Sequence, residues 1–378
     1  MTTTKPTLEL LRSLSDEHVL RVLMARRQAT RAEIAAESGL SKPTVSESVR
    51  RLSENGSVVD TGERTTGRGR VGTYYALPDT TGCALVASVL PDGIMAEAVD
   101  VYGHVVGQAD VSLPRSVEPG RVAEALEQVA AALAGEGVGP FRLAVVSGAG
   151  PVDRETGRLV ELPDAPALLG ALDAPAVLSS LVDGLVTVDN DVNWAARAEH
   201  DHGRAGSVRD FVYLFLDQGL GCAVLADGEV RRGHAGLAGE IAHVMTVGPD
   251  GAAMRLTDVF AALGLRRSGS TAIDVPVLLR AVGADVDVRD ALARSLAGVL
   301  SAVVALTDPA VVLIGGAWGS DPGVVEAIAR ELEDAPRGVP IEVASVNDAP
   351  ALRAARETAL QQLRELVIAS APRQFAPT

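Results

Sequence analysis

Residues 30–52 read TRAEIAAESGLSKPTVSESVRRL, and this stretch decides the fold of the first part of the chain. Thr30 followed three residues later by Glu33 is a capping-box pattern, which predicts that a helix begins there. Gly39 favours a tight turn because glycine adopts a positive φ at little cost. Ser41 is a typical cap for a second helix. The stretch therefore predicts two short helices around a turn.

The second of these helices has one apolar and one polar face. Val45, Val49 and Leu52 recur at positions i, i+4 and i+7, so we expect them to pack inward. The opposite face is free to enter a major groove of DNA, where short polar side chains and arginines contact base edges and phosphates. The candidate DNA-contacting residues on this face are Lys42, Thr44, Ser46, Glu47 and Arg50.

The sequence on either side completes a known DNA-binding pattern. Residues 15–27 are amphipathic and predict a supporting helix, and residues 62–72 (GERTTGRGRVG) predict a glycine-rich hairpin tip. We expect its arginines, Arg64, Arg68 and Arg70, to contact phosphates or a minor groove. The alternative is an ordinary helical hairpin beside a solvated charged loop. The order of helices, turn glycine and basic hairpin favours a winged helix-turn-helix that binds duplex DNA.

The charge of the chain is divided unevenly. Residues 1–78 hold 12 Lys and Arg against 9 Asp and Glu, a net charge of +3, although the whole chain of 378 residues has a net charge of −15. DNA attracts the basic part and repels the acidic remainder. Because the length also exceeds a usual single core, we predict a DNA-binding domain at 1–78, a linker at 79–82 and a second domain at 83–372.

Cysteine content and hydropathy favour a cytoplasmic protein. The two cysteines, Cys83 and Cys222, each lie in an apolar run and are predicted to be buried free thiols. The first residues (MTTTKPT) carry no apolar signal core, and no stretch approaches 18 uninterrupted apolar residues. We therefore expect no disulfide and no membrane association.

The remainder of the chain predicts an α/β fold built from two similar halves. Three strand-like runs begin at Cys83, and a helix over 118–134 and a strand over 141–147 follow them. The same order returns from Phe211, with helices near 290–306 and 324–333 and a strand over 310–314. A repeated βββαβα unit predicts duplicated lobes with a ligand-binding cleft between them.

Four segments of this second part together resemble the ROK family, which contains repressors, open-reading-frame proteins and sugar kinases. They are SGAGPVDRETGRL, VTVDNDVNWAARAE, LDQGLGCAVLADGEVRRGHAGLAGEIAH and DPAVVLIGG. The resemblance covers about residues 83–370 and implies the actin-like ATPase fold. A winged helix-turn-helix in front of such a domain is similar to regulators of the xylose-repressor type in that family.

The resemblance implies a sugar site. The family's Asn-Asp pair, which contacts sugar hydroxyls and supplies the general base in kinase members, falls on Asn190 and Asp191. A second sugar-contacting element falls on Glu240 and His243 within GEIAH. Carboxylate, amide and imidazole groups all suit hydroxyl recognition. The alternatives are a helix N-cap for Asn190 or Asp191 and a buried structural imidazole for His243.

The chain departs from the family where kinases bind ATP and zinc. The first phosphate loop, Asp-x-Gly-Gly-Thr in kinases, is replaced by ASVLPDG at 87–93, and the second begins with Asp217, which repels phosphate. The cysteines of zinc-bearing members are absent after His243, and Asp164 stands where many members have a sugar-contacting Asn. We therefore expect no catalytic residues, no metal and no cofactor.

These observations favour a sequence-specific transcriptional regulator, most simply a repressor, that acts as a homodimer or higher homo-oligomer on operator DNA. Its ROK-like domain dimerises and senses a sugar or related small ligand. One alternative is a ROK-type sugar kinase that uses Asp191 as its base. A second alternative is a regulator whose ROK-like domain no longer senses a ligand.

Overall fold

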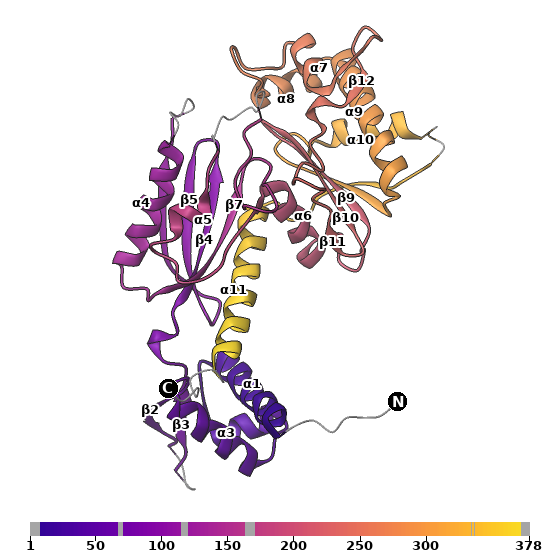
Figure 1. The fold of residues 1–378 in the computed structure, drawn as a ribbon. Helices are drawn as coiled ribbons and strands as arrows, with labels where there is room; N and C mark the ends of the chain where they lie inside the picture. Colours follow the sequence, from indigo (N-terminus) through magenta and orange to yellow (C-terminus); the bar gives the residue numbers. More distant parts are fainter. Residues whose placement is uncertain are drawn as a thin grey trace.

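The computed structural model describes residues 8–66, 71–114, 120–162, 171–333, 335 and 337–371. Figure 1 shows a small N-terminal head and two larger lobes, each built around a β-sheet. The long C-terminal helix runs from the lobes down to the head.

The head has the predicted winged helix-turn-helix architecture. The capping box is present, since the Glu33 carboxylate accepts from the Thr30 backbone N–H at 2.7 Å and Thr30 Oγ1 accepts from the Glu33 N–H at 3.3 Å. Gly39 ends the first of the two helices with φ of 72°. One short strand was not predicted, and it pairs with the returning strand of the wing. The elements are α1 (Leu8–Arg26), β1 (Gln28–Thr30), α2 (Arg31–Ser38), α3 (Lys42–Glu54), β2 (Val59–Arg64) and β3 (Thr73–Ala76).

The first lobe is a five-stranded sheet in the order β6-β5-β4-β7-β8. Its first three strands are antiparallel neighbours, and β7 and β8 add in parallel. A single 3-10 turn, η1 (Asp79–Thr81), connects the head to it. The elements are β4 (Cys83–Leu90), β5 (Gly93–Asp100), β6 (Val105–Ser112), α4 (Arg121–Gly135), β7 (Phe141–Gly148), α5 (Ala174–Leu178), β8 (Val186–Asn190) and α6 (Asp191–His202).

The second lobe repeats this topology in a sheet of order β11-β10-β9-β14-β15, which confirms the predicted duplication. An insertion with two short strands and two helices follows β11. The elements are β9 (Phe211–Leu216), β10 (Leu220–Ala226), β11 (Glu229–Val230), η2 (Ile241–His243), β12 (Met245–Val247), β13 (Ala253–Arg255), α7 (Leu256–Ala262), α8 (Val275–Ala284), α9 (Val286–Thr307), β14 (Val311–Gly315), α10 (Pro322–Leu332), β15 (Ile341–Val343) and α11 (Pro350–Ser370).

Helix α9 is the one helix in the described part of the chain that is long and apolar enough to cross a membrane. Half of its most apolar 18-residue stretch is buried inside the protein. Leu292, Leu296 and Leu300 on its inner face belong to the core of the second lobe. The packing is that of a core helix, since amphipathic burial against other elements accounts for its apolar face.

Helix α11 joins the head to the first lobe. It packs along α6, β4 and β7, and its last turn contacts α1 (Figure 1). The buried residues of the head and those on one face of the first sheet form a single apolar cluster, with Leu352 and Leu363 of α11 between them. The amide of Asn55 also donates to the Ala371 carbonyl at 2.6 Å. The domain boundaries at 78 and 82 stay predictions, because this core runs across them.

A second contact fixes the turn between β5 and β6 against the head. The Arg27 guanidinium lies 3.7 Å from the Asp100 carboxylate and stacks over the ring of Tyr102 at 5.2 Å. From the other side, Arg364 of α11 donates to the Val101 carbonyl at 3.0 Å. One turn of the first lobe is therefore held by both the head and α11.

Replacement of Leu363 by Ala tests how much this shared core contributes. Leu363 is fully buried, so we expect Leu363→Ala to lower the free energy of unfolding by about 2–5 kcal/mol, as cavity-forming substitutions do. The matched control is Leu306→Ala, because Leu306 is 86% exposed and its loss is expected to change stability by less than about 0.5 kcal/mol. Equal melting temperatures for the two variants would contradict a stabilising role of Leu363 in this core.

Candidate functional site

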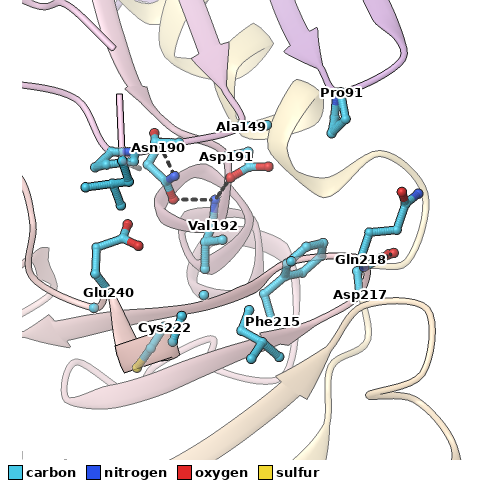
Figure 2. Close-up of a pocket in the computed structure, with 18 of the residues that line it drawn as sticks. Pro91, Ala149, Asn190, Asp191, Val192, Phe215, Asp217, Gln218, Cys222 and Glu240 are labelled. Atoms are coloured by element: carbon cyan, nitrogen blue, oxygen red, sulfur yellow. Dashed lines mark hydrogen bonds between the residues drawn. The ribbon is translucent and has the colours of Figure 1, made fainter. Parts of the chain in front are cut away.

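A cavity of about 330 Å³ lies between the two lobes. Its wall is formed by the turn after β4, the loop after β7, the junction of β8 and α6, the β9–β10 turn and the segment 236–243. Phe215 and Phe260 supply apolar surface, and the carboxylates of Asp191, Asp217 and Glu240 supply polar surface (Figure 2). A cleft between duplicated α/β lobes that mixes apolar walls with a few polar groups is typical of a small-molecule site.

All four residues predicted to bind a ligand line this cavity. Asn190 and Asp191 stand where β8 ends and α6 begins, and Glu240 and His243 lie on and beside η2. Asn190 also has the structural role given as the alternative. Its side-chain oxygen caps α6 by accepting from the Val192 N–H at 2.9 Å, and its amide donates to the Gly150 carbonyl at 2.8 Å. The role of these four residues in ligand binding stays a prediction.

Burial raises the pKa of the two carboxylic acids in the middle of the cavity. The pKa of Asp191 rises to about 7, first because burial disfavours the charged form and also because the Glu240 carboxylate is nearby. Burial likewise raises the pKa of Glu240. The hydrogen bond that Asp191 accepts from the Val192 N–H at 2.9 Å favours its ionised form and opposes this shift. Burial therefore favours the neutral forms of both acids more than water does.

Glycine at 239 allows the segment with Glu240 and His243 to reach the cavity. Gly239 has a φ of +94°, and a Cβ atom there would lie 1.7 Å from the Cys222 carbonyl oxygen. The Cys222 N–H in turn donates to the Gly239 carbonyl at 3.1 Å. Only a residue without a side chain permits this close approach of the two backbones.

The chain after His243 is held by hydroxyl groups. Thr246 Oγ1 donates to the Ser295 carbonyl, and Ser295 Oγ donates to the Val247 carbonyl, each at 2.6 Å. Both side chains are buried between β12 and α9. Hydroxyl and backbone groups are poor zinc ligands, so these residues do not fit the zinc site that the family resemblance implies for this segment.

Asp217 occupies the turn where family kinases have their second phosphate loop. Its carboxylate accepts from the Gln218 N–H at 2.7 Å and, across the turn after β14, from the Ala317 N–H at 3.2 Å. The indole of Trp318 donates to the Asp217 carbonyl at 2.9 Å. Two backbone N–H groups of these turns, those of Gln218 and Ala317, are thus bonded to a carboxylate and do not face the cavity as free donors for a phosphate.

A buried ion pair behind the cavity was missed by sequence reasoning. Asp189 is 5% exposed and accepts from Arg232 Nε at 2.9 Å and Nη2 at 2.5 Å. The Asn193 amide donates to its other oxygen at 2.8 Å. The pair connects β8 to the segment that leads to Glu240. An aspartate at the end of a buried strand was a signal, but nothing local pointed to Arg232 as its partner.

The predicted DNA-contacting face of α3 points to solvent. Lys42, Ser46, Glu47 and Arg50 are exposed, and Thr44 is half-buried and hydrogen-bonded to Ser41. Hydrogen bonds that Arg50 donates to the carboxylates of Glu47 and Glu54 raise the pKa of its guanidinium.

The wing arginine that the structure describes is also paired within the head. Arg64 donates to Asp60 at 2.8 Å and 3.1 Å. Arg68 and Arg70 lie outside the described residues, as does Asp164. Each described arginine of the predicted DNA surface therefore has a carboxylate partner in the absence of DNA.

Comparison with known proteins finds the same two parts. Residues 92–255 match the ROK family model, and residues 12–59 match a model for winged helix-turn-helix DNA-binding domains. The glucokinase of Streptomyces coelicolor is 30% identical over 159 residues, which are 42% of this chain and 48% of that enzyme. The chain thus spans about half the length of the curated relatives that it matches first.

Two regulators are also similar to this chain. The xylose repressor of Caldicellulosiruptor bescii is 24% identical over 247 residues, which are 62% of this chain and 59% of that protein. The crystal structure of a ROK family transcriptional regulator, a homolog of the E. coli MLC protein, superposes with a TM-score of 0.59 at 17% identity. It covers 95% of this chain and 99% of its own, so the head and both lobes share one fold with it.

Gly239→Ala tests the close approach that places Glu240 and His243. We expect a larger loss of stability than in Gly251→Ala, because both positions have a positive φ but a Cβ at Gly251 meets nothing within 4 Å. The control variant carries only the backbone cost, about 1–2 kcal/mol. Thermal unfolding of the two variants measures the difference, and an equal decrease in melting temperature would contradict the steric argument.

The raised pKa of Asp191 predicts a pH dependence of stability. The folded chain binds this proton more tightly than the unfolded chain, whose aspartates titrate near pH 4. The stabilisation that neutral Asp191 contributes to the folded state is therefore fully present below about pH 4, and it is lost as the pH rises to about 7. We expect Asp191→Asn to gain in melting temperature over the wild type as the pH is raised from 5 to 7, with no further gain above. A difference that does not change with pH would refute the shift.

Proposed function

We propose that this chain, which carries a ROK family domain behind an N-terminal winged helix-turn-helix domain, is a DNA-binding transcriptional regulator that responds to a small polyol. The observation that carries the proposal is the exposed polar face of α3 on a head with a net charge opposite to that of the lobes. Repression is the simplest direction of regulation, and operator binding places the protein in the cytoplasm.

Contact with DNA requires a change of partners at α3. Arg50 bonds to Glu47 at 2.7 Å and to Glu54 at 2.6 Å in the free head. Exposed ion pairs of this kind contribute little stability, so a guanine edge or a phosphate can replace the glutamates. Glu47, once released, is free to accept from a cytosine amino group. Two heads related by a two-fold axis would contact half-sites one helical turn apart, which favours a homodimer.

The cavity is the site we propose for the effector, and its connection to the head is short. Helix α6 begins at the cavity with Asn190 and Asp191, and it packs along α11, whose last turn contacts the head. Glu199 near the end of α6 accepts the Ser345 N–H at 2.6 Å and the Val346 N–H at 2.5 Å, just before α11. A ligand that prefers one arrangement of the lobes would shift α11 and, with it, the two heads.

Kinase activity is the alternative that the cavity disfavours. Asp191 stands where a general base is expected, but Asp217 brings a negative charge and takes the Ala317 N–H for itself. Transfer of a phosphoryl group needs cations and N–H donors around the phosphates. We therefore propose that the protein binds its ligand without modifying it.

Arg50→Ala tests the proposed DNA contact. A gel-shift with the promoter DNA adjoining the gene should show salt-sensitive, sequence-selective binding by the wild type. We expect the variant to bind that site about 5- to 150-fold more weakly, the equivalent of about 1–3 kcal/mol for one bidentate base contact.

The matched control is Arg121→Ala, which removes an exposed, glutamate-paired guanidinium from α4 in the first lobe. We expect it to bind DNA like the wild type. If the wild type binds no such promoter selectively, the proposed function is refuted.

A further inference from the structure

The charged groups around the cavity are of one sign. Among its described lining residues there is no Lys or Arg. Besides the Cys222 thiol, the ionisable side chains are Asp92, Asp191, Asp217, Glu240 and a single imidazole, His243. Arg232, which precedes the segment with Glu240, donates to the buried Asp189. The wall therefore offers up to four carboxylates and no permanent cation.

These carboxylates differ in how well they are satisfied. Asp217 accepts two backbone N–H groups, and Asp191 accepts one. Glu240 accepts no hydrogen bond from any residue that the structure describes. Figure 2 shows its carboxylate on the cavity side of the segment, facing the start of α6. A half-buried carboxylate without a donor is costly to ionise, and a ligand that donates to it and neutralises it removes that cost.

We propose that the cavity selects a polyol that carries a protonated amine, such as an amino sugar, and rejects the same polyol when it carries a phosphate. The ammonium group binds between Glu240 and Asp191, and the hydroxyls bond to the remaining polar wall. This inference rests on the proposed function only in treating the cavity as the effector site.

The physical reason is the sign and the burial of the charge. An ammonium group supplies three donors and one positive charge to two carboxylates whose burial disfavours ionisation. Its binding would lower the pKa of Asp191 toward the ordinary range, since an opposite charge nearby favours the ionised form. A phosphate would add further negative charge beside Asp217, with no Lys or Arg in the described lining to pair with it.

The size and the apolar part of the wall suit a single sugar ring. The cavity volume of about 330 Å³ is at the small end of ligand sites. Phe215, Leu220, Phe260 and Ile273 supply apolar surface that can cover the C–H face of a pyranose.

The test is a panel of matched ligands on the full-length protein. Glucose, galactose and mannose are each compared with the 2-amino-2-deoxy sugar and the 6-phosphate of the same configuration, by thermal shift and by titration calorimetry at fixed ionic strength. We expect at least one amino sugar to bind ten-fold or more tightly than its neutral parent, and the phosphates not to bind. A phosphate or a neutral sugar that binds as tightly as the amine, or silence across the whole panel, would overturn the inference.

Glu240→Gln separates charge recognition from shape. The variant should bind the amino sugar and the neutral sugar with nearly equal affinity, while Glu229→Gln, an exposed position on β11 of the same lobe, should keep the full preference. An unchanged preference in Glu240→Gln would overturn the assigned contact, and circular dichroism confirms that the variant is folded.

A gel-shift of the wild type with each ligand distinguishes this inference from the proposed function. Loss of promoter binding in every condition, together with selective amine binding, refutes regulation and leaves the ligand assignment intact. Promoter binding without any preference for the amine refutes the ligand assignment alone.

Discussion

One apolar core, shared by the head and the first lobe, is the constraint on which the rest of the structure depends. Helix α11 closes the second repeat of the chain, yet its buried side chains pack on strands of the first repeat and its last turn contacts the head. Because burial of apolar surface is the main favourable term in folding, none of these three parts can move far without disturbing the others. The cleft between the lobes therefore lies on a frame that extends to the DNA-binding surface.

The features that were predictable from sequence are those that local chemistry decides. The capping box at Thr30, the turn at Gly39 and the serine cap of α3 each depend on neighbours within a few residues, and each is present. The strands that begin at Cys83 and at Phe211 were recognisable as apolar runs between turns, whereas the short strands β12, β13 and β15 were not predicted. Helix α11 was not, because its charged residues interrupt the apolar pattern and its partner strands are far away in the sequence. Tertiary packing, which periodicity does not report, supplies its stability.

The residues of the site divide in the same way, into those that the sequence predicted and those that only the folded chain reveals. Asn190, Asp191, Glu240 and His243 were brought together by a family resemblance, and the fold does place all four around one cavity. The pair of Asp189 and Arg232 could not be foreseen, because 43 residues separate the two partners and nothing near Asp189 in the sequence points to Arg232. The role of Asp217 was foreseen only as a repulsive charge. Its bond to the Ala317 N–H depends on two turns from different strands meeting, which is a property of the folded chain.

The carboxylate of Asp217 affects whether occupancy of the cavity reports the concentration of a ligand or the rate at which that ligand is converted. An enzyme that phosphorylates its sugar lowers the concentration of that sugar. The fraction of its sites that hold sugar then reflects the rate of the reaction as well as the concentration. Under the proposed function, in which the Ala317 N–H stays bonded to Asp217, a ligand leaves the cavity unmodified. For a regulator, the occupancy of the cavity then follows the free concentration of the ligand at equilibrium. Such binding neither depletes the ligand nor consumes ATP.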